Sequence, residues 1–290
     1  MTDRNPQRNA PDGSAGGGDH LLRPKTLLDP LIVGVLAAVV SLGGGGRPSF
    51  WYDEAATISA AYSRSLSQLW HMLGNVDAVE GLYYVLMHGW FKIVPPTEFW
   101  SRVPSGLAVG AAAAGVVVLG KQFSSRTVAL ASGVVCAILP RTTWAGIEAR
   151  PYAISMMAAV WLTVLLIRAT RRDDVWVWLC YGLVLTMSVL LDVYLVLMSP
   201  VYLAFICAFR RSRTVVLRFA LASVLAGAAL TPFLMAAIGQ THQISWVAPI
   251  GHRTIEDVAV QQYFERSPPF GILSALIVTT AIGLWLFTST

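Results

Sequence analysis

The chain has 290 residues, of which 55% are hydrophobic and only 13% are charged, and its mean hydropathy is +0.60. Soluble domains carry about a quarter charged residues, so the composition excludes a disordered polymer and argues against a water-soluble globule. The net charge of +5 does not indicate a nucleic-acid partner, because the basic residues form no stripe interleaved with aromatics and gather instead in short clusters between apolar runs. The three cysteines all lie inside apolar runs, which excludes a disulfide framework.

Residues 1–27 are rich in Gly, Pro, Asn and Asp and have no apolar periodicity, so the sequence predicts a disordered cytoplasmic tail. The remainder, residues 28–290, is predicted to be one transmembrane domain. The apolar run at 30–46 is predicted to be a retained first span and not a signal peptide, because a long tail precedes it and no A-x-A cleavage site follows it.

Residues 82–94 decide the topology of everything that follows them. This stretch contains His88 and Lys92 and is well short of the roughly 20 residues of a spanning helix. If it crossed the bilayer, the later basic clusters would lie outside, against the positive-inside rule. We therefore expect it to lie in the membrane interface, with the N-terminus inside. Eight spans follow from this choice, near residues 30–46, 103–120, 127–142, 151–167, 175–191, 193–209, 214–236 and 270–288.

Residues 47–101 then form a long polar outer loop, and loops of this length usually carry function. Ser65 and Gln68 resemble a capping box that begins a short helix. Another helical segment is expected at 53–62, and 82–94 follows as a further amphipathic segment. The predicted fold class is therefore all-α: a polytopic membrane bundle of about eight transmembrane helices, with amphipathic juxtamembrane helices in its first outer loop.

Acidic residues in this outer loop indicate a site. Asp53 and Glu54 directly follow the first span, and Asp77 and Glu80 precede the third amphipathic segment. The second outer loop adds Arg150, which has no basic neighbours and lies where the positive-inside rule does not call for a cation. Because arginine binds phosphate oxygens bidentately and a carboxylate can accept a proton, the pattern predicts a site for a phosphorylated lipid.

Four stretches of this region resemble the GT-C glycosyltransferases, in particular the family of protein O-mannosyltransferases and bacterial aminoarabinose transferases of lipid A. The chain looks most like the actinobacterial mannosyltransferase-like members, and the resemblance covers about residues 30–250. The stretches are Trp51-Tyr52-Asp53-Glu54-Ala55, Asp77-Ala78-Val79-Glu80-Gly81-Leu82-Tyr83-Tyr84, Arg102-Val103-Pro104-Ser105 and Glu148-Ala149-Arg150-Pro151-Tyr152.

The resemblance implies a GT-C-like helical bundle in the plasma membrane with its active site facing outside. It implies inverting transfer of a sugar, mannose by preference, from a polyprenyl phosphate carrier to a protein or glycolipid hydroxyl. The family's loop aspartate maps onto Asp53, which we expect to be the general base. Arg150 is then expected to bind the carrier phosphate, and the acids Glu54, Asp77 and Glu80 are expected to contact the acceptor, the sugar or a metal.

Further residues complete the expected substrate-binding set. Tyr84 and Tyr152 supply hydroxyls or stack on a sugar, with simple anchoring of the loop as the alternative. Arg102 is a second phosphate contact or a snorkelling span end. Trp246, in the outer loop after the seventh span, stacks on a sugar or acceptor, or belongs to an ordinary solvated loop.

No cofactor is predicted with certainty. The histidines lack a metal-ligand spacing such as HExxH. Related sequences often have a histidine where this chain has Glu80, which weakens the case for a metal there. A bound divalent cation stays open as an alternative.

Two alternatives to the enzyme stay open. The eighth span ends the chain, whereas family members generally continue, so we expect a truncated form, and an inactive homologue acting as an assembly subunit would fit. A membrane transporter or lipid flippase is the other alternative. Transporter sites lie at the bilayer midplane between internal repeats; we find no repeat, although residues 43–46 and Pro232 could break helices.

Overall fold

The computed structural model describes residues 24–172, 174–209, 212–245, 251, 254 and 267–288, and every regular element among these residues is helical. This confirms the predicted all-α class. The α-helices are α1 (Pro24–Leu42), α2 (Tyr52–Ala61), α3 (Leu66–Leu73), α4 (Gly81–Trp90), α5 (Glu98–Gly120), α6 (Arg126–Ile138), α7 (Pro140–Gly146), α8 (Tyr152–Arg172), α9 (Val175–Leu191), α10 (Met198–Phe209), α11 (Arg213–Gly239) and α14 (Pro268–Thr288). Short 3-10 turns lie at η2 (Ala78–Glu80), η3 (Val193–Leu197) and η4 (Thr241–Ile244).

The predicted cytoplasmic tail, residues 1–27, lies mostly outside the described residues. Its last four residues, 24–27, belong to the first turn of α1 instead, because the helix begins at Pro24. A proline is well suited to the start of a helix, where its missing N–H has no partner to lose.

Three helices are long and apolar enough to cross a membrane, namely α5, α8 and α11. A fourth span results if α6 and α7 are taken together, although they are bent by 61° at their junction. The predicted continuous span at 127–142 is therefore broken at Pro140, whose ring cannot continue the hydrogen-bond ladder of α6. Within the described residues, α1, α9, α10 and α14 contribute shorter apolar segments, so the number of eight spans stays a prediction.

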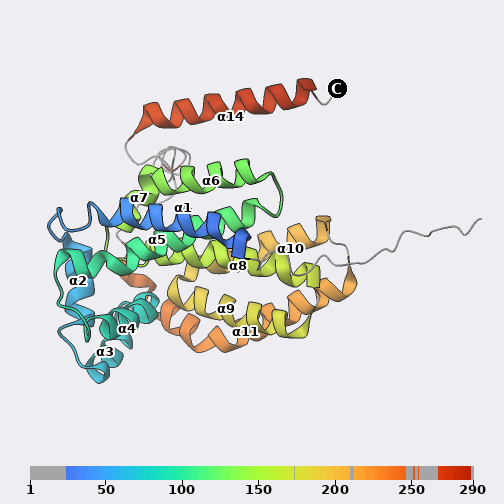
Figure 1. Cartoon of the computed structure of the whole chain (residues 1–290). Coiled ribbons are helices and arrows are strands. Elements are labelled where there is room, and N and C mark those ends of the chain that lie inside the picture. The colour runs from blue at the N-terminus through green and yellow to red at the C-terminus, as the bar shows by residue number, and fades with distance from the viewer. Residues whose placement is uncertain are drawn as a thin grey trace, which may run out of the picture.

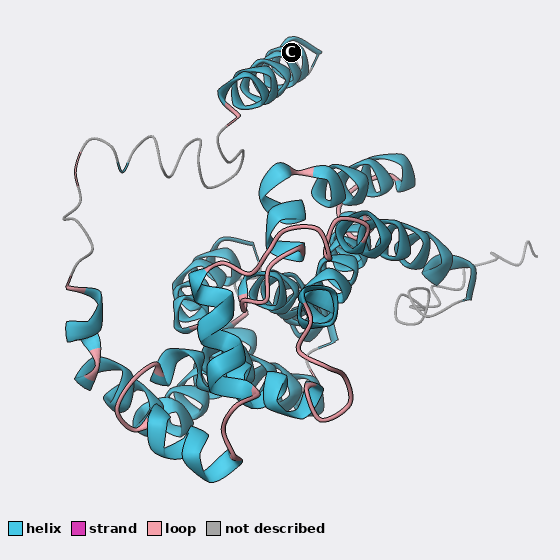
Figure 2. Ribbon diagram, turned by 90° about the vertical axis from the view of Figure 1, so that its left-hand side faces the viewer, coloured by secondary structure: helices cyan, strands magenta, loops and turns pink. Residues whose placement is uncertain are grey.

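The long helices run side by side, and the short helices α2, α3 and α4 gather at the end of the bundle where α1 ends and α5 begins (Figure 1). With 10 residues, α4 is about 15 Å long, half of the hydrocarbon thickness, and is therefore too short to span a bilayer. Figure 2 shows α14 apart from the other helices. The connection between α7 and α8 reaches the same end as α2, which brings the two predicted outer loops together.

The helix α3 begins at the predicted capping box. The Ser65 hydroxyl accepts a hydrogen bond from the Gln68 N–H at 3.3 Å, and Gln68 Oε1 accepts one from the Ser65 N–H at 2.9 Å. The helix buries Leu69 and Leu73 against Tyr83 of α4. Together these contacts form a small separate core, which packs α2, α3 and α4 against one another.

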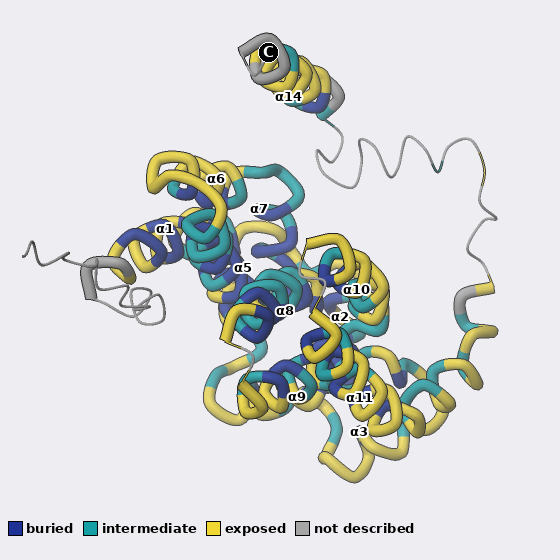
Figure 3. The backbone as a smooth tube through the Cα atoms, turned by 90° about the vertical axis from the view of Figure 1, so that its right-hand side faces the viewer, coloured by how far each residue is buried: buried dark blue, intermediate teal, exposed yellow. Residues whose placement is uncertain are grey.

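The backbones of α1 and α5 approach each other closely. Gly34 and Gly110 face each other, and a Cβ atom added to Gly110 would lie 2.6 Å from the carbonyl oxygen of Gly34. Small residues allow helix backbones to approach in this way in membranes. Figure 3 shows α5 enclosed by its neighbours, with its buried surface continuous toward α8. The pair therefore sets the position from which α5 carries Arg102 toward the outer loop.

Substitution of Gly110 by alanine tests this packing. The new methyl group meets backbone and not a flexible side chain, so α1 and α5 must separate, and we expect a loss of about 1–3 kcal/mol of unfolding free energy. The matched control is Gly227→Ala in α11, where an added Cβ meets nothing within 4 Å. Unfolding in detergent micelles, followed by tryptophan fluorescence, measures both. Equal stabilities of the two variants would contradict the close contact.

Candidate functional site

A fully buried ion pair joins α5 to α2. Arg102 is 1% exposed and Glu54 is 0% exposed. The guanidinium donates to both carboxylate oxygens, from Nε to Oε1 at 2.8 Å and from Nη2 to Oε2 at 2.6 Å. Such a bidentate pair is among the strongest polar contacts available to a protein.

The remaining N–H groups of Arg102 hold the chain between α1 and α2. Nη1 donates to the carbonyl oxygens of Gly45 at 2.8 Å and Pro48 at 2.7 Å, and Nη2 donates to that of Ser49 at 3.3 Å. Arginine has five N–H donors, and these contacts together with the bidentate pair use the whole fork. The loop that leads into α2 is thus fixed by one side chain.

Glu54 extends the same network to the second outer loop. Its Oε1 accepts a hydrogen bond from the Ala149 N–H at 2.8 Å, and its Oε2 accepts one from the Trp51 N–H at 3.4 Å. One residue earlier, the carbonyl oxygen of Glu148 accepts a hydrogen bond from the Ser105 hydroxyl at 2.6 Å. The single peptide group that joins Glu148 to Ala149 is therefore held from both sides, its carbonyl by α5 and its N–H by α2, which positions the side chains next to it.

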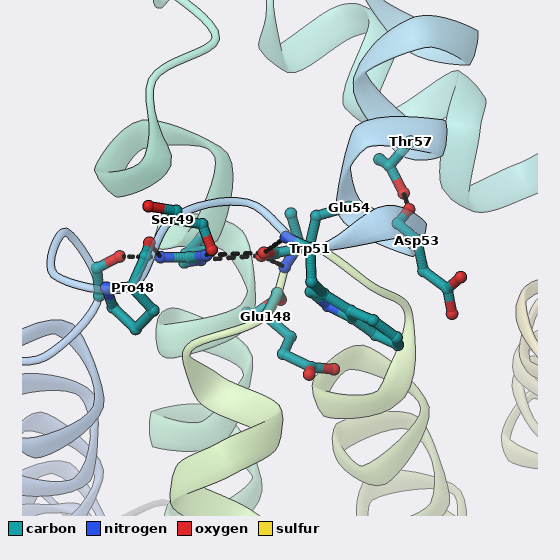
Figure 4. Close-up of polar contacts among 11 residues, drawn as sticks. Pro48, Ser49, Trp51, Asp53, Glu54, Thr57 and Glu148 are labelled. Atoms are coloured by element: carbon teal, nitrogen blue, oxygen red, sulfur yellow. Dashed lines mark hydrogen bonds and ion pairs between the residues drawn. The ribbon is translucent and has the colours of Figure 1, made fainter.

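The carboxylate of Asp53 is different from that of its neighbour Glu54. Asp53 is half-buried, and within the described residues its carboxylate forms no hydrogen bond or ion pair; the Thr57 hydroxyl donates only to its backbone oxygen. Figure 4 shows Asp53 and Glu54 leaving α2 in opposite directions, with the Asp53 carboxylate pointing away from the dashed contacts of the ion pair. The start of α2 is held in place through Glu54, and it therefore presents the Asp53 carboxylate without a partner among the described residues.

Arg150 forms the second ion pair of this region, with Glu80. Its Nη2 atom lies 2.9 Å from Glu80 Oε1, and the two side chains are 12% and 17% exposed. The pair is incompletely satisfied, because Arg150 Nε and Glu80 Oε2 are buried and have no hydrogen-bond partner in the described part of the chain. Burial raises the pKa of Glu80 to about 7; the nearby acids Asp77, Asp192 and Asp53 add to the rise, and Arg150 opposes it.

Glu148 is a further buried acid in this cluster. It is 6% exposed, and its Oε2 atom has no hydrogen-bond partner among the described residues. Burial, together with the charges of Glu54 and Asp53, raises the pKa of Glu148 to about 8 against the opposing effect of Arg141 and Arg150. Near neutral pH, Glu148 is therefore largely a neutral acid.

The position of Asp77 is set by the far end of α11. The side chain of Gln240 accepts from the Ala78 N–H at 2.8 Å and donates to the Leu73 carbonyl at 2.9 Å, and Gln243 accepts from the Asp77 N–H at 3.4 Å. Asp77 has a φ of 55°, a left-handed conformation that is uncommon outside glycine but tolerated by aspartate.

The side chain of Asp77 contacts the fully buried Tyr84, whose hydroxyl donates to Asp77 Oδ2 at 3.3 Å. Burial raises the pKa of Tyr84, so its hydroxyl stays protonated and keeps donating. Tyr84 thus has a defined partner in the loop that contains Glu80.

Aromatic rings and two arginines form a ladder at the start of α8. Trp144 and Tyr152 stack with ring centroids 5.7 Å apart. The Arg141 guanidinium lies 4.0 Å from the Trp144 ring centroid, and that of Arg150 lies 6.0 Å from the Tyr152 centroid. Both contacts are within cation–π range. The ladder places two cations along one apolar surface.

The structure brings together most of the residues selected from the sequence. Asp53, Asp77, Glu80, Tyr84, Arg150 and Tyr152 all lie at the end of the bundle that carries α2, α3 and α4. Glu54 and Arg102 lie there too, but each is occupied by the other and by backbone groups, so they support the site and present no open face to a substrate. In particular, Arg102 does not snorkel to the surface. Trp246 lies outside the described residues.

Three residues of the site were not selected from the sequence: Arg141, Trp144 and Glu148 as an acid in its own right. The sequence feature that led to the selection of Arg150 is also present at Arg141, which is an isolated cation near the predicted outer end of the span at 127–142. The structural use of Gln240 and Gln243 carries no such signal, because glutamine is common in solvated loops.

Within the described residues, no three His, Cys, Asp or Glu side chains lie close enough together to hold a metal ion. The chain matches no protein-family model, no curated protein and no solved structure at a significant level. The candidate site is therefore defined by its own geometry: an unpaired carboxylate, a partly satisfied arginine and a set of buried acids.

Replacement of Arg102 by methionine tests the network. It leaves Glu54 as an uncompensated buried charge, which costs about 3–5 kcal/mol of unfolding free energy. The double variant Arg102→Met with Glu54→Leu should lose less than the sum of the single variants, because neither charge is then left alone. Denaturant unfolding in micelles measures the cycle, and the exposed Arg171→Met serves as the control, with an expected change within about 0.5 kcal/mol. Additive losses would show that the pair is not coupled.

Proposed function

We propose that the chain is an integral membrane glycosyltransferase that transfers a sugar from a polyprenyl phosphate carrier to a hydroxyl acceptor. The observation that carries the proposal is the unpaired Asp53 carboxylate, held by a rigid network at the same end of the bundle as Arg150. Mannose is the proposed sugar, on the resemblance noted above, and a protein or glycolipid the acceptor. The outer face of the plasma membrane is the proposed location, on the charge pattern of the loops.

The chemistry needs one base and one anion-binding group. The acceptor hydroxyl loses its proton to Asp53 as its oxygen forms a bond to the anomeric carbon of the sugar. The bond from that carbon to the carrier phosphate breaks on the opposite face, and the electron pair leaves with the phosphate, which inverts the anomeric configuration. Because the phosphate is a good leaving group, no general acid is required, and a base together with a phosphate-binding cation is sufficient.

Arg150 is the proposed phosphate ligand, and its pairing with Glu80 suits this use. The guanidinium has a buried N–H without a partner, and Glu80 occupies only part of the fork. An incoming phosphate takes the place of the Glu80 carboxylate at the Arg150 guanidinium, which is already desolvated. Tyr152, on the same ladder, offers an apolar face for the first isoprene unit or the sugar ring.

The short helices support approach of a lipid carrier from the membrane. Trp70 of α3 is 75% exposed and Tyr52 at the start of α2 is 86% exposed. Such rings are typical of segments at headgroup level, where they have an apolar body and a polar tip. The proposed site therefore lies at the depth where the phosphate of a polyprenyl carrier meets water.

A lipid flippase or transporter is the second candidate, and the bend between α6 and α7 favours it. Transporter sites are built on such interrupted helices. The interruption here is followed directly by the segment that carries Glu148 and Arg150, so both candidates use the same residues. They differ in whether the bond between carrier and sugar is cleaved.

Replacement of Asp53 by asparagine tests the enzyme. With purified full-length protein and polyprenyl phosphate mannose labelled in the sugar, we expect transfer to fall at least about 100-fold, the lower range of general-base catalysis, while carrier binding is kept. The control is Asp174→Asn at the start of α9, because asparagine caps a helix as well as aspartate. Full transfer by the Asp53 variant would contradict the assignment of the base. Movement of intact carrier across vesicles without bond cleavage would favour the flippase.

Glu80 gives the proposed enzyme a pH dependence. Above about pH 7 the carboxylate is charged and competes with the carrier phosphate for Arg150; below its raised pKa it is neutral and releases the arginine. The apparent affinity for the carrier should therefore fall by about tenfold as the pH rises from 6 to 8, the value of one charge-assisted hydrogen bond. In Glu80→Gln most of this fall should disappear, and the part that is left comes from Glu148, whose pKa of about 8 lies in the same range.

Equilibrium binding of polyprenyl phosphate mannose at several pH values measures this effect, because its phosphodiester keeps a single charge over this range, whereas a phosphate monoester titrates near about pH 6. Glu98→Gln, in the first turn of α5, is the control and should keep the pH dependence of the unaltered protein. A Glu80→Gln variant that keeps the full fall in affinity between pH 6 and 8 would contradict the role given to Glu80.

A further inference from the structure

A groove on the opposite side of the molecule from α1 runs between α9 and α11. It has a volume of about 390 Å³. Its floor is made of Trp178, which is 4% exposed, together with Gly182 and the small residues Ala222 and Ala226. Its walls are leucines of both helices, which are largely exposed. They are Leu179, Leu183, Leu221 and Leu225.

The groove is deep because small residues form its floor. Gly182 packs on Ala222, and a Cβ added to Gly182 would lie at ordinary contact distance, 3.5 Å, from the Ala222 carbonyl oxygen. At one end Thr186 lines the groove, but its hydroxyl donates to the Gly182 carbonyl at 2.9 Å. Its polar atom is therefore satisfied within α9, and the interior of the groove is apolar.

The other end of the groove is basic. Among the described residues that line it, Arg218 is the charged one, and it lies near the first turn of α9. Arg171 and Arg172 end the preceding helix α8, three residues before α9 begins, and Arg213 begins α11. Clusters of this kind at one end of membrane helices bind anionic lipid headgroups.

The dimensions of the groove fit one hydrocarbon chain. From Val175 to Thr186 it extends along α9 for about 16 Å, which is half of a hydrocarbon core of about 30 Å. The groove therefore covers the depth of one leaflet, which is the depth that a single acyl chain occupies.

We propose that the groove between α9 and α11 binds an anionic phospholipid of the leaflet at the basic end of the bundle. An acyl chain lies on the floor formed by Gly182, Ala222 and Ala226, and the headgroup phosphate accepts hydrogen bonds from Arg218. This site is distinct from the candidate catalytic site, which lies at the other end of the helices, and it does not depend on the proposed enzyme activity.

Native mass spectrometry of the full chain tests the site. The protein is released from nanodiscs that contain equal amounts of palmitoyl-oleoyl phosphatidylglycerol and palmitoyl-oleoyl phosphatidylcholine. We expect the unaltered protein to retain phosphatidylglycerol in preference to phosphatidylcholine. Gly182→Leu fills the floor and Arg218→Gln removes the phosphate ligand, so each should lower retained phosphatidylglycerol by about tenfold.

Two matched controls lie outside the groove. Gly227→Leu introduces the same side chain where an added Cβ meets nothing within 4 Å, and Lys92→Gln removes an exposed cation in the loop after α4; both should retain the lipid. If Gly182→Leu fails to fold, as judged by thermal unfolding, Leu183→Trp fills the groove from its wall and replaces it in the test.

Three results would overturn the proposal. Equal retention of the two lipids would show that no anionic headgroup is selected. Retention of phosphatidylglycerol by both groove variants would place the lipid elsewhere. A dimer of the unaltered protein that Gly182→Leu dissociates, with lipid retention unchanged, would assign the groove to a second copy of the chain.

Discussion

The guanidinium of Arg102 lies where the loop after α1, the start of α2 and the connection between α7 and α8 meet, and it contacts the first two directly. Its five N–H groups bind one carboxylate and the backbone of the loop before α2. Glu54 then passes the connection to Ala149. A charge pair of this kind is stable in a buried place only if every donor and acceptor is satisfied, and here the backbone supplies the missing partners. The neighbouring side chains Asp53 and Arg150 take their positions from it.

The candidate site differs from the Arg102 network in how well its buried polar groups are paired. Its polar atoms are incompletely paired: one oxygen of Glu80, one nitrogen of Arg150 and one oxygen of Glu148 are buried without partners in the described part of the chain. Unsatisfied buried groups cost free energy, and the raised pKa values of Glu80 and Glu148 express that cost. A fully satisfied frame thus supports a cluster of acids around one arginine that is ready to accept an anion.

Part of this arrangement follows from local rules that a sequence displays. The capping box at Ser65 is a short-range pattern, and the shared end of the two outer loops follows from the spacing of basic clusters and apolar runs. The burial of Arg102 is not visible in this way, because its partners are 48 and more residues away and an arginine at a span end usually snorkels. The break at Pro140 is not visible in this way either, because prolines are also tolerated inside membrane helices, as Pro104 in α5 and Pro232 in α11 are here. The ladder of Arg141 and Trp144 depends on that break.

The long sequence separation within the Glu54 network has a consequence for biogenesis. Glu54 acquires its partners from residues 48 and 95 positions later in the chain. At about 5–20 residues per second, synthesis exposes this acid for on the order of several seconds before Arg102 emerges, and longer before Ala149 does. During that interval α1 has been synthesised without the contacts that orient the segment behind it. This end of the bundle can therefore be completed only after Ala149 and the start of α8 have been synthesised.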